Sequence, residues 1–210
     1  MSEVVSVDAD HPAEDVIARA ATVLRQGRLL IYPTDTLYAL GGLALQAPVG
    51  RAVREAKGRD EGKPLPLVAS GPEQARSICA SWPEAAARLA ARFWPGPLSL
   101  VLPARPDVPR EVTSGTGTVA VRVPARELPR RLCGDGPLIA TSANRAGEPP
   151  PRSCAEAVAA VGAAAALALE GGSGRPVPST LVDLTGSAPR LLRAGPVEWG
   201  DVLATLGLPS

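Results

Sequence analysis

Glycine and proline interrupt this chain along its whole length. The 210 residues include 21 glycines and 23 prolines. Proline removes a main-chain donor and glycine weakens both helices and strands, so long uninterrupted elements are disfavoured. The sequence therefore predicts many short helices and strands joined by turns.

Composition places the chain among globular proteins, because 45% of its residues are hydrophobic. Lys plus Arg number 22 and Asp plus Glu 21, which leaves a net charge of +1 and argues against bulk electrostatic binding of nucleic acid or anionic membranes. The one histidine, His11, argues against histidine-based triads and most zinc sites. The length favours a single domain over residues 1–210.

The cysteines and the N-terminus indicate a cellular compartment. Cys79, Cys133 and Cys154 are odd in number and form no CxxC pair, so we expect free thiols in a reducing cytoplasm. The acidic start MSEVVSVDAD lacks the apolar run of a signal peptide. No stretch has the length and apolar character of a membrane span, and we expect a cytoplasmic protein that does not contact membranes.

Helical and strand patterns are interleaved, but without the regular period of a barrel or a doubly wound sheet. The expected helices are 12–26, 49–57, 72–79, 83–94, 153–161 and 197–206. The expected strands are 4–7, 29–32, 65–69, 98–102, 118–123, 138–140, 166–169, 180–184 and 190–193. We expect a loop over 33–42 and an edge or bulged strand over 65–69, which contains Pro66. These elements predict one α/β domain with a twisted, mixed β-sheet.

Two polar segments of the first third of the chain each permit two interpretations. Thr34 and Thr36 follow a buried strand, where they either bind a ligand or close the strand as a hydroxyl-stabilised turn. Lys57 and Arg59 flank Gly58 at a helix end, where they either clamp an anion or complement the helix dipole. The chain contains no GxxxxGK[ST] or GxGxxG sequence, so a nucleotide would be held without either fingerprint.

Further polar residues lie at the ends of expected strands. Arg122 in Val-Ala-Val-Arg-Val faces opposite to its valine neighbours, so it is either solvated or lines a cleft and binds a carboxylate. The segment Thr141-Ser142-Ala143-Asn144 ends an apolar strand and suits either ligand binding or helix capping. Ser179 opens one strand and Arg193 ends another, and each is weak evidence for a ligand-binding site when taken alone.

In combination, these motifs resemble those of the YrdC family of L-threonylcarbamoyladenylate synthases. PTDTLYALG is similar to the family's P-T-[DE]-T-x-Y-G-L-G loop, with Ala39 in place of its usual glycine, and KGRDEGKPL is similar to K-x-R-x-x-x-x-P-L. WPGPLSLVL, TVAVRVP, TSAN, STLVD and LLRAGP follow in the family's order, so the resemblance spans about residues 29–196. It implies a YrdC/RibB-like α/β fold whose sheet curves around an open cleft with flanking helices.

The resemblance implies that L-threonine, bicarbonate and ATP are converted to threonylcarbamoyl-AMP and pyrophosphate. Downstream tRNA threonylcarbamoyl transferase proteins would use this intermediate to modify adenosine 37 of tRNA. Mg²⁺ is expected on the ATP phosphates, with no metal ligand assigned to the chain. By position, the resemblance places threonine beside Thr34, Arg122, Ser142 and Ser179, and the nucleotide beside Lys57, Arg59, Thr118, Asn144 and Arg193, with Lys57 and Arg59 as the catalytic cations.

The chain departs from the family pattern at two further places. Asp60 and Glu61 put negative charge beside the predicted cation clamp, and Pro66-Leu67-Val68 stands where some members have a threonine-contacting histidine. Two alternatives stay open. One is a double-stranded RNA-binding module of the same fold, which would contact RNA directly, and the other is a related enzyme that forms a carbamoyl adenylate.

Overall fold

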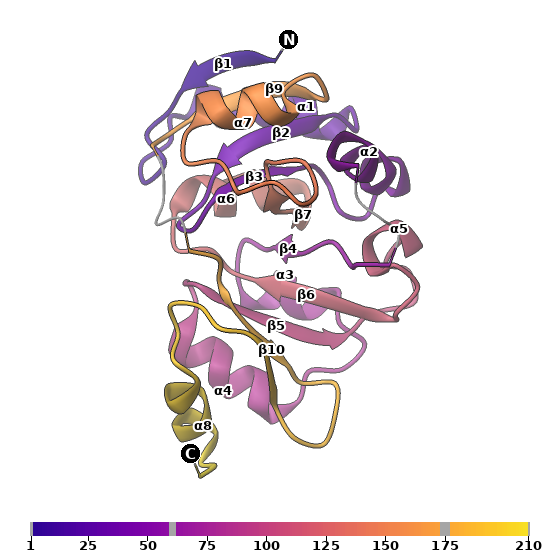
Figure 1. Cartoon of the computed structure of the whole chain (residues 1–210), viewed down its shortest axis with the longest axis vertical. Helices are drawn as coiled ribbons and strands as arrows, with labels where there is room; N and C mark the ends of the chain where they lie inside the picture. The colour runs from indigo at the N-terminus through magenta and orange to yellow at the C-terminus, as the bar shows by residue number, and fades with distance from the viewer. Residues whose placement is uncertain (1, 59–61, 173–176, 210) are drawn as a thin grey trace.

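The computed structural model describes residues 2–58, 62–172 and 177–209. Within these ranges the strands form two mixed sheets, one toward each end of the elongated molecule (Figure 1). The predicted α/β class, with mixed strand directions and flanking helices, is confirmed. The strands do not form one continuous sheet, however, because hydrogen bonding divides them into two groups.

The first sheet has the order β1-β9-β2-β3-β8. In it β1 and β2 are parallel to β9, whereas β3 is antiparallel to both β2 and β8. Its strands are β1 (Glu3–Ser6), β2 (Leu29–Pro33), β3 (Tyr38–Gly41), β8 (Thr141–Ser142) and β9 (Ala165–Glu170). The helices that pack around it are α1 (Glu14–Arg25), α2 (Ala47–Lys57), α6 (Glu127–Leu132), which is followed by a 3-10 turn (Cys133–Asp135), and α7 (Cys154–Val161).

Strand β2 is apolar along its whole length because helices cover both of its faces. Leu29 and Ile31 share a buried cluster with residues of α2 and α7. Leu30 and Tyr32 share another with residues of α1 and α6. A strand covered on both sides has no solvated face, so it shows a continuous apolar run instead of alternation.

The second sheet has the order β11-β10-β5-β6-β4-β7. Its strands are β4 (Leu67–Val68), β5 (Leu98–Pro103), β6 (Thr118–Arg122), β7 (Leu138–Ile139), β10 (Thr180–Asp183) and β11 (Arg190–Arg193). The remaining helices are α3 (Pro72–Ser77), α4 (Glu84–Phe93), α5 (Arg110–Thr113) and α8 (Trp199–Leu206), and α4 packs against α8.

Alternation along β5, β6 and β10 gives the second sheet a core face and a cleft face. The core face carries buried aliphatic side chains that share one cluster with residues of α4 and α8: Leu98, Leu100, Leu102, Val119, Val121 and Val182. Side chains between them point to the opposite face, because successive residues of a strand alternate. This cleft face consists of Ser99, Val101, Thr118, Ala120, Arg122, Leu181 and Asp183.

The prediction of a loop over residues 33–42 is wrong, because Tyr38–Gly41 form β3. This strand forms a hairpin with β2 through the loop Thr34–Leu37 and also pairs with β8. A Cβ atom on Gly41 would lie 1.6 Å from the main-chain oxygen of Ile139. The close approach of the two segments therefore requires glycine at this position.

We expect Gly41→Ala to lower the free energy of unfolding by about 3 kcal/mol, because the overlap involves main-chain atoms that no side-chain rotation can move. Urea unfolding followed by circular dichroism measures the effect. Gly200→Ala in α8 is the matched control, since nothing lies within 4 Å of its added Cβ and alanine favours a helix. Equal unfolding midpoints for the two variants would contradict the expectation.

Three other elements differ from the sequence prediction. Strand β4 is not at an edge, because it lies between β6 and β7, and Pro66 precedes the strand instead of interrupting it. Helices α5 and α6 lie where no helix was expected. Pro129 is the third residue of α6, a position whose N–H has no partner within a helix, so the proline costs no helical hydrogen bond.

The three cysteines are free, as expected, and they are buried. Burial raises the pKa of the Cys79 thiol to about 11 and that of the Cys133 thiol to about 12, so both stay protonated at neutral pH. In the part of the chain that the structure covers, no helix has both the length and the apolar character needed to cross a membrane.

Candidate active site

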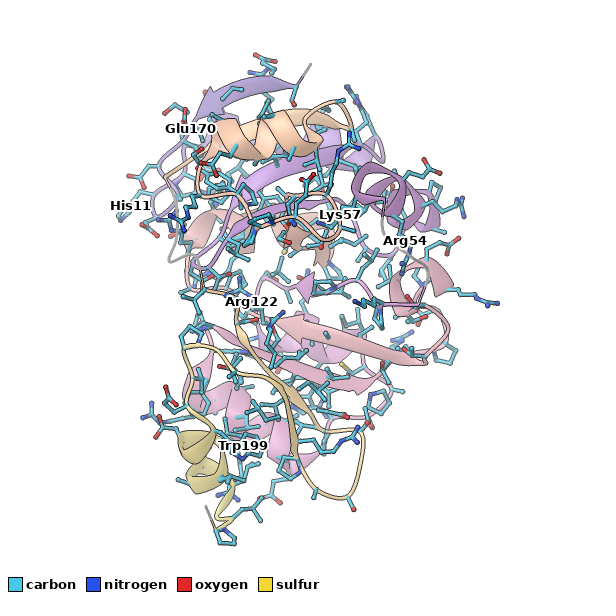
Figure 2. The ribbon with its side chains drawn as sticks, in the orientation of Figure 1. His11, Arg54, Lys57, Arg122, Glu170 and Trp199 are labelled. Carbon is cyan, nitrogen blue, oxygen red and sulfur yellow. The ribbon has the colours of Figure 1, made fainter. Side chains whose placement is uncertain are left out.

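A pocket of about 510 Å³ lies between the cleft face of the second sheet and the β2–β3 hairpin of the first. Arg122 lies near the middle of the molecule, between the two sheets (Figure 2). Six of the nine residues that the sequence analysis assigned to the site line this pocket. They are Thr34, Thr118, Arg122, Ser142, Ser179 and Arg193.

Arg122 is a buried cation that faces the cleft, which excludes its interpretation as a solvated side chain. It is the last residue of β6 and only 6% exposed. Its Nη1 donates a hydrogen bond to Oδ1 of Asp35 at 2.7 Å, and its Nη2 donates to Oγ1 of Thr34 at 3.2 Å and of Thr36 at 2.9 Å. The guanidinium is thereby held against the hairpin loop.

Both interpretations of the Thr34–Leu37 segment are compatible with its structure. Oγ1 of Thr34 accepts hydrogen bonds from the main-chain N–H of Thr36 at 3.2 Å and of Leu37 at 3.1 Å, so the segment is a hydroxyl-stabilised turn. The side chains of Thr34, Thr36 and Leu37 also line the pocket. The turn therefore closes the hairpin and presents hydroxyl groups to the pocket.

Arg193 supplies a second cation to the same space. Its Nε donates to the main-chain oxygen of Ser179 at 2.9 Å and its Nη2 to Oγ of Ser179 at 3.1 Å, and this Oγ lies 2.8 Å from Oγ of Ser99. Partial burial, together with repulsion from Arg122, lowers the pKa of the Arg193 guanidinium. Two arginines that repel each other across one pocket make it suitable for carboxylate or phosphate groups.

Lys57 and Asn144 lie beside the pocket and do not line it. The Lys57 side chain is 3% exposed, and its ammonium donates to the main-chain oxygens of Ser142 and Asn144. The Asn144 amide donates to the main-chain oxygens of Arg145 at 2.9 Å and Glu148 at 2.7 Å. Lys57 thus ties the end of α2 to the segment after β8, and its contact with a triphosphate stays a prediction.

The pocket also contains polar residues that the sequence analysis did not consider for ligand binding, among them Lys63, Ser99 and Asp183. Burial alone would raise the pKa of the Asp183 carboxyl, but hydrogen bonds from Thr185 and a neighbouring arginine outweigh it and lower that pKa. Alternation along β5 is the signal that could have identified Ser99, because this residue faces opposite to the leucines beside it.

The remaining candidates lie outside this pocket or outside the described residues. Arg59 belongs to residues 59–61, which the structure does not describe. His11 lies at the periphery of the molecule, well separated from Arg122 (Figure 2), and its Nδ1 is 3.7 Å from Oδ2 of Asp8. Among residues 2–58, 62–172 and 177–209, no group of three His, Cys, Asp or Glu side chains is arranged to hold a metal ion.

This arrangement suits catalysis by orientation and charge neutralisation. Two arginines and several hydroxyl groups surround the pocket, and they can fix anionic ligands relative to one another. The buried thiols are protonated and the histidine is peripheral, so the described residues do not present an imidazole or thiolate nucleophile to the pocket.

Comparison with known proteins gives consistent results. A family model named Sua5_yciO_yrdC, described as "Telomere recombination", matches residues 22–195. The threonylcarbamoyl-AMP synthase of Pyrococcus abyssi is 40% identical over 191 residues, which are 90% of this chain and 56% of that protein. The threonylcarbamoyl-AMP synthase of Thiobacillus denitrificans is 38% identical over 175 residues, which are 81% of this chain and 91% of that protein.

Among solved structures, that of P. abyssi Sua5 complexed with L-threonine matches with a TM-score of 0.93 and 38% sequence identity. The match covers 98% of this chain and 61% of that chain. The chain thus spans little more than half of the Pyrococcus protein and most of the Thiobacillus protein.

Proposed function

This chain belongs to the Sua5/YciO/YrdC family, and on that premise we propose that it is an L-threonylcarbamoyladenylate synthase. The reaction joins L-threonine, bicarbonate and ATP, and releases threonylcarbamoyl-AMP and pyrophosphate. The observation that carries the proposal is the cationic pocket in which six residues from widely separated segments meet. Relatives with this activity in their names support it.

Threonine is assigned to the part of the pocket around Arg122. Three of the five guanidinium N–H groups are used by Asp35 and two threonines, and the other two have no protein acceptor among the described residues. One of these, Nε–H or the second Nη1–H, would donate to the substrate carboxylate, with Thr34, Ser142 and Ser179 around the rest of the amino acid. The structure of P. abyssi Sua5 complexed with L-threonine supports threonine as the amino acid that is bound.

ATP is assigned to the part of the pocket near Thr118, Asn144 and Arg193, with Lys57 and Arg59 toward the triphosphate. Arg193 faces the pocket, and a guanidinium binds phosphate oxygens through paired N–H groups. Mg²⁺ arrives with ATP, because triphosphate oxygens and water are the ligands that it prefers.

The reaction proceeds in two steps. The threonine amine adds to carbon dioxide derived from bicarbonate and loses a proton, which gives a carbamate. A carbamate oxygen then attacks the α-phosphorus of ATP, and pyrophosphate leaves. Because the nucleophile belongs to the substrate, the protein contributes orientation through hydroxyls and arginines and neutralises the phosphate charge.

The proposal extends to the place of the reaction and the use of its product. The three free thiols support a reducing compartment, and we place the reaction in the cytoplasm. The intermediate would pass to tRNA threonylcarbamoyl transferase proteins that modify adenosine 37.

The test is mass spectrometry of the product formed from ATP, bicarbonate and a panel of amino acids, together with a pyrophosphate-release assay. We expect pyrophosphate release that depends on threonine and a product with the mass of threonylcarbamoyl-AMP. Serine and valine are the matched control amino acids in the panel. A product that lacks the amino acid would favour the carbamoyl-adenylate alternative. Salt-sensitive binding of double-stranded RNA without turnover would favour the RNA-binding module.

A further inference from the structure

Asp35 lies between Thr34 and Thr36 but, unlike them, does not line the pocket. Its carboxylate accepts a hydrogen bond from Nη1 of Arg122 at 2.7 Å. The two side chains are 13% and 7% exposed, and no other ion pair of the described residues has both partners so deeply buried. Asp35 can therefore act on a ligand only through Arg122.

The Asp35–Arg122 pair connects the two sheets across the cleft. Asp35 belongs to the hairpin loop between β2 and β3 of the first sheet, and Arg122 ends β6 of the second. All protein acceptors found for the Arg122 guanidinium lie in this one loop, and only Asp35 among them is charged. A charged acceptor holds a guanidinium more tightly than a hydroxyl does, particularly where water is scarce.

The loop can hold Asp35 in place because it is braced from within. Oγ1 of Thr34 accepts from two main-chain N–H groups of the turn, and the main-chain N–H of Thr34 donates to the oxygen of Leu37 at 3.1 Å. Arg193, which lines the same pocket, repels Arg122. The negative charge of Asp35 offsets that repulsion and keeps Arg122 against the loop.

We infer that Asp35 is a positioning residue, which fixes the Arg122 guanidinium so that an N–H group left free by the loop is directed to the amino-acid carboxylate. The inference rests on the proposed function, and it assigns to the acid of the P-T-[DE]-T motif the task of orienting the carboxylate-binding arginine. Without the charge of Asp35, the guanidinium is free to turn away from the pocket. Amino-acid binding then weakens, whereas ATP binding and turnover at saturating threonine change little.

Steady-state kinetics of Asp35→Asn, with threonine and ATP varied in turn, tests the inference. The substitution keeps the size of the side chain and an acceptor oxygen but removes the charge. We expect KM for threonine to rise about tenfold, with KM for ATP and kcat each within about threefold of the wild type. Asp35→Glu restores the charge, and we expect it to recover most of the threonine affinity.

The controls separate this role from a merely structural one. Asp107→Asn removes an exposed partner of Arg105 and should leave all three constants unchanged. An unchanged or lowered KM for threonine in Asp35→Asn, or equal rises of both KM values, would overturn the positioning role. If Asp35→Asn does not fold, failure of folded Asp35→Glu to bind threonine like the wild type overturns it as well. A wild-type chain without threonine-dependent activity would instead refute the proposed function itself.

Discussion

Arg122→Ala is expected to lower kcat/KM for threonine by roughly 30- to 5,000-fold, which corresponds to about 2–5 kcal/mol for truncating one partner of a buried charge pair. The substrate carboxylate would lose the only buried guanidinium that lines the pocket among the described residues. Threonine-dependent pyrophosphate release by the purified variant measures the effect.

Two further variants make the Arg122 result interpretable. Arg122→Ala also leaves Asp35 buried without its cation, so its unfolding must be measured alongside its activity. Arg122→Lys keeps the charge but loses the planar fork, and we expect an intermediate loss. Arg105→Ala, an exposed arginine paired with Asp107, should retain full activity. Full activity of folded Arg122→Ala would exclude Arg122 from the threonine site.

Lys57→Ala is expected to reduce turnover more than about 100-fold and also to lower the free energy of unfolding by about 1–3 kcal/mol. Its ammonium donates to the main-chain oxygens of Ser142 and Asn144, and both acceptors lose this donor in the variant. The segment after β8 would then lose its tie to α2. The same pyrophosphate assay and a urea titration measure the two effects.

Lys57→Met isolates the charge, because it keeps the apolar stem of the side chain. Arg88→Ala is the matched control: Arg88 is an exposed cation that also donates to a main-chain oxygen, that of Leu206, at 3.3 Å. It should change neither activity nor stability appreciably. Wild-type turnover by folded Lys57→Met would remove Lys57 from the catalytic groups.

Sequence patterns correctly predicted the strands whose structure is indicated by the order of apolar and polar residues within the strand itself. The alternation Val-Ala-Val-Arg-Val correctly separated Arg122 from its core-facing neighbours, since the period of a strand is two. The continuous apolar run at Leu29–Tyr32 correctly indicated a buried strand, which extends one residue further, to Pro33. Family motifs then brought together six pocket residues that no local pattern connects.

What the sequence did not reveal depends on contacts between distant segments. Strand β3 also pairs with β8, and its Gly41 approaches the main chain of Ile139, which is 98 positions away; no local pattern encodes these contacts. A lysine at the end of a helix normally complements the helix dipole from the solvent. The Lys57 ammonium instead donates to main-chain oxygens that lie 85 and 87 positions later in the chain. The pairing of Asp35 with Arg122 likewise requires the two sheets to be placed first.

The separation of core and cleft residues along β5, β6 and β10 has a consequence for redesign. Positions 99, 101, 120 and 181 alternate with the leucines and valines that hold the domain together. Libraries randomised at these four positions should therefore yield variants that differ in the amino acid they accept as substrate. Most of these variants should remain thermally stable. The fold offers a site whose chemistry can be diversified with little interference from its architecture.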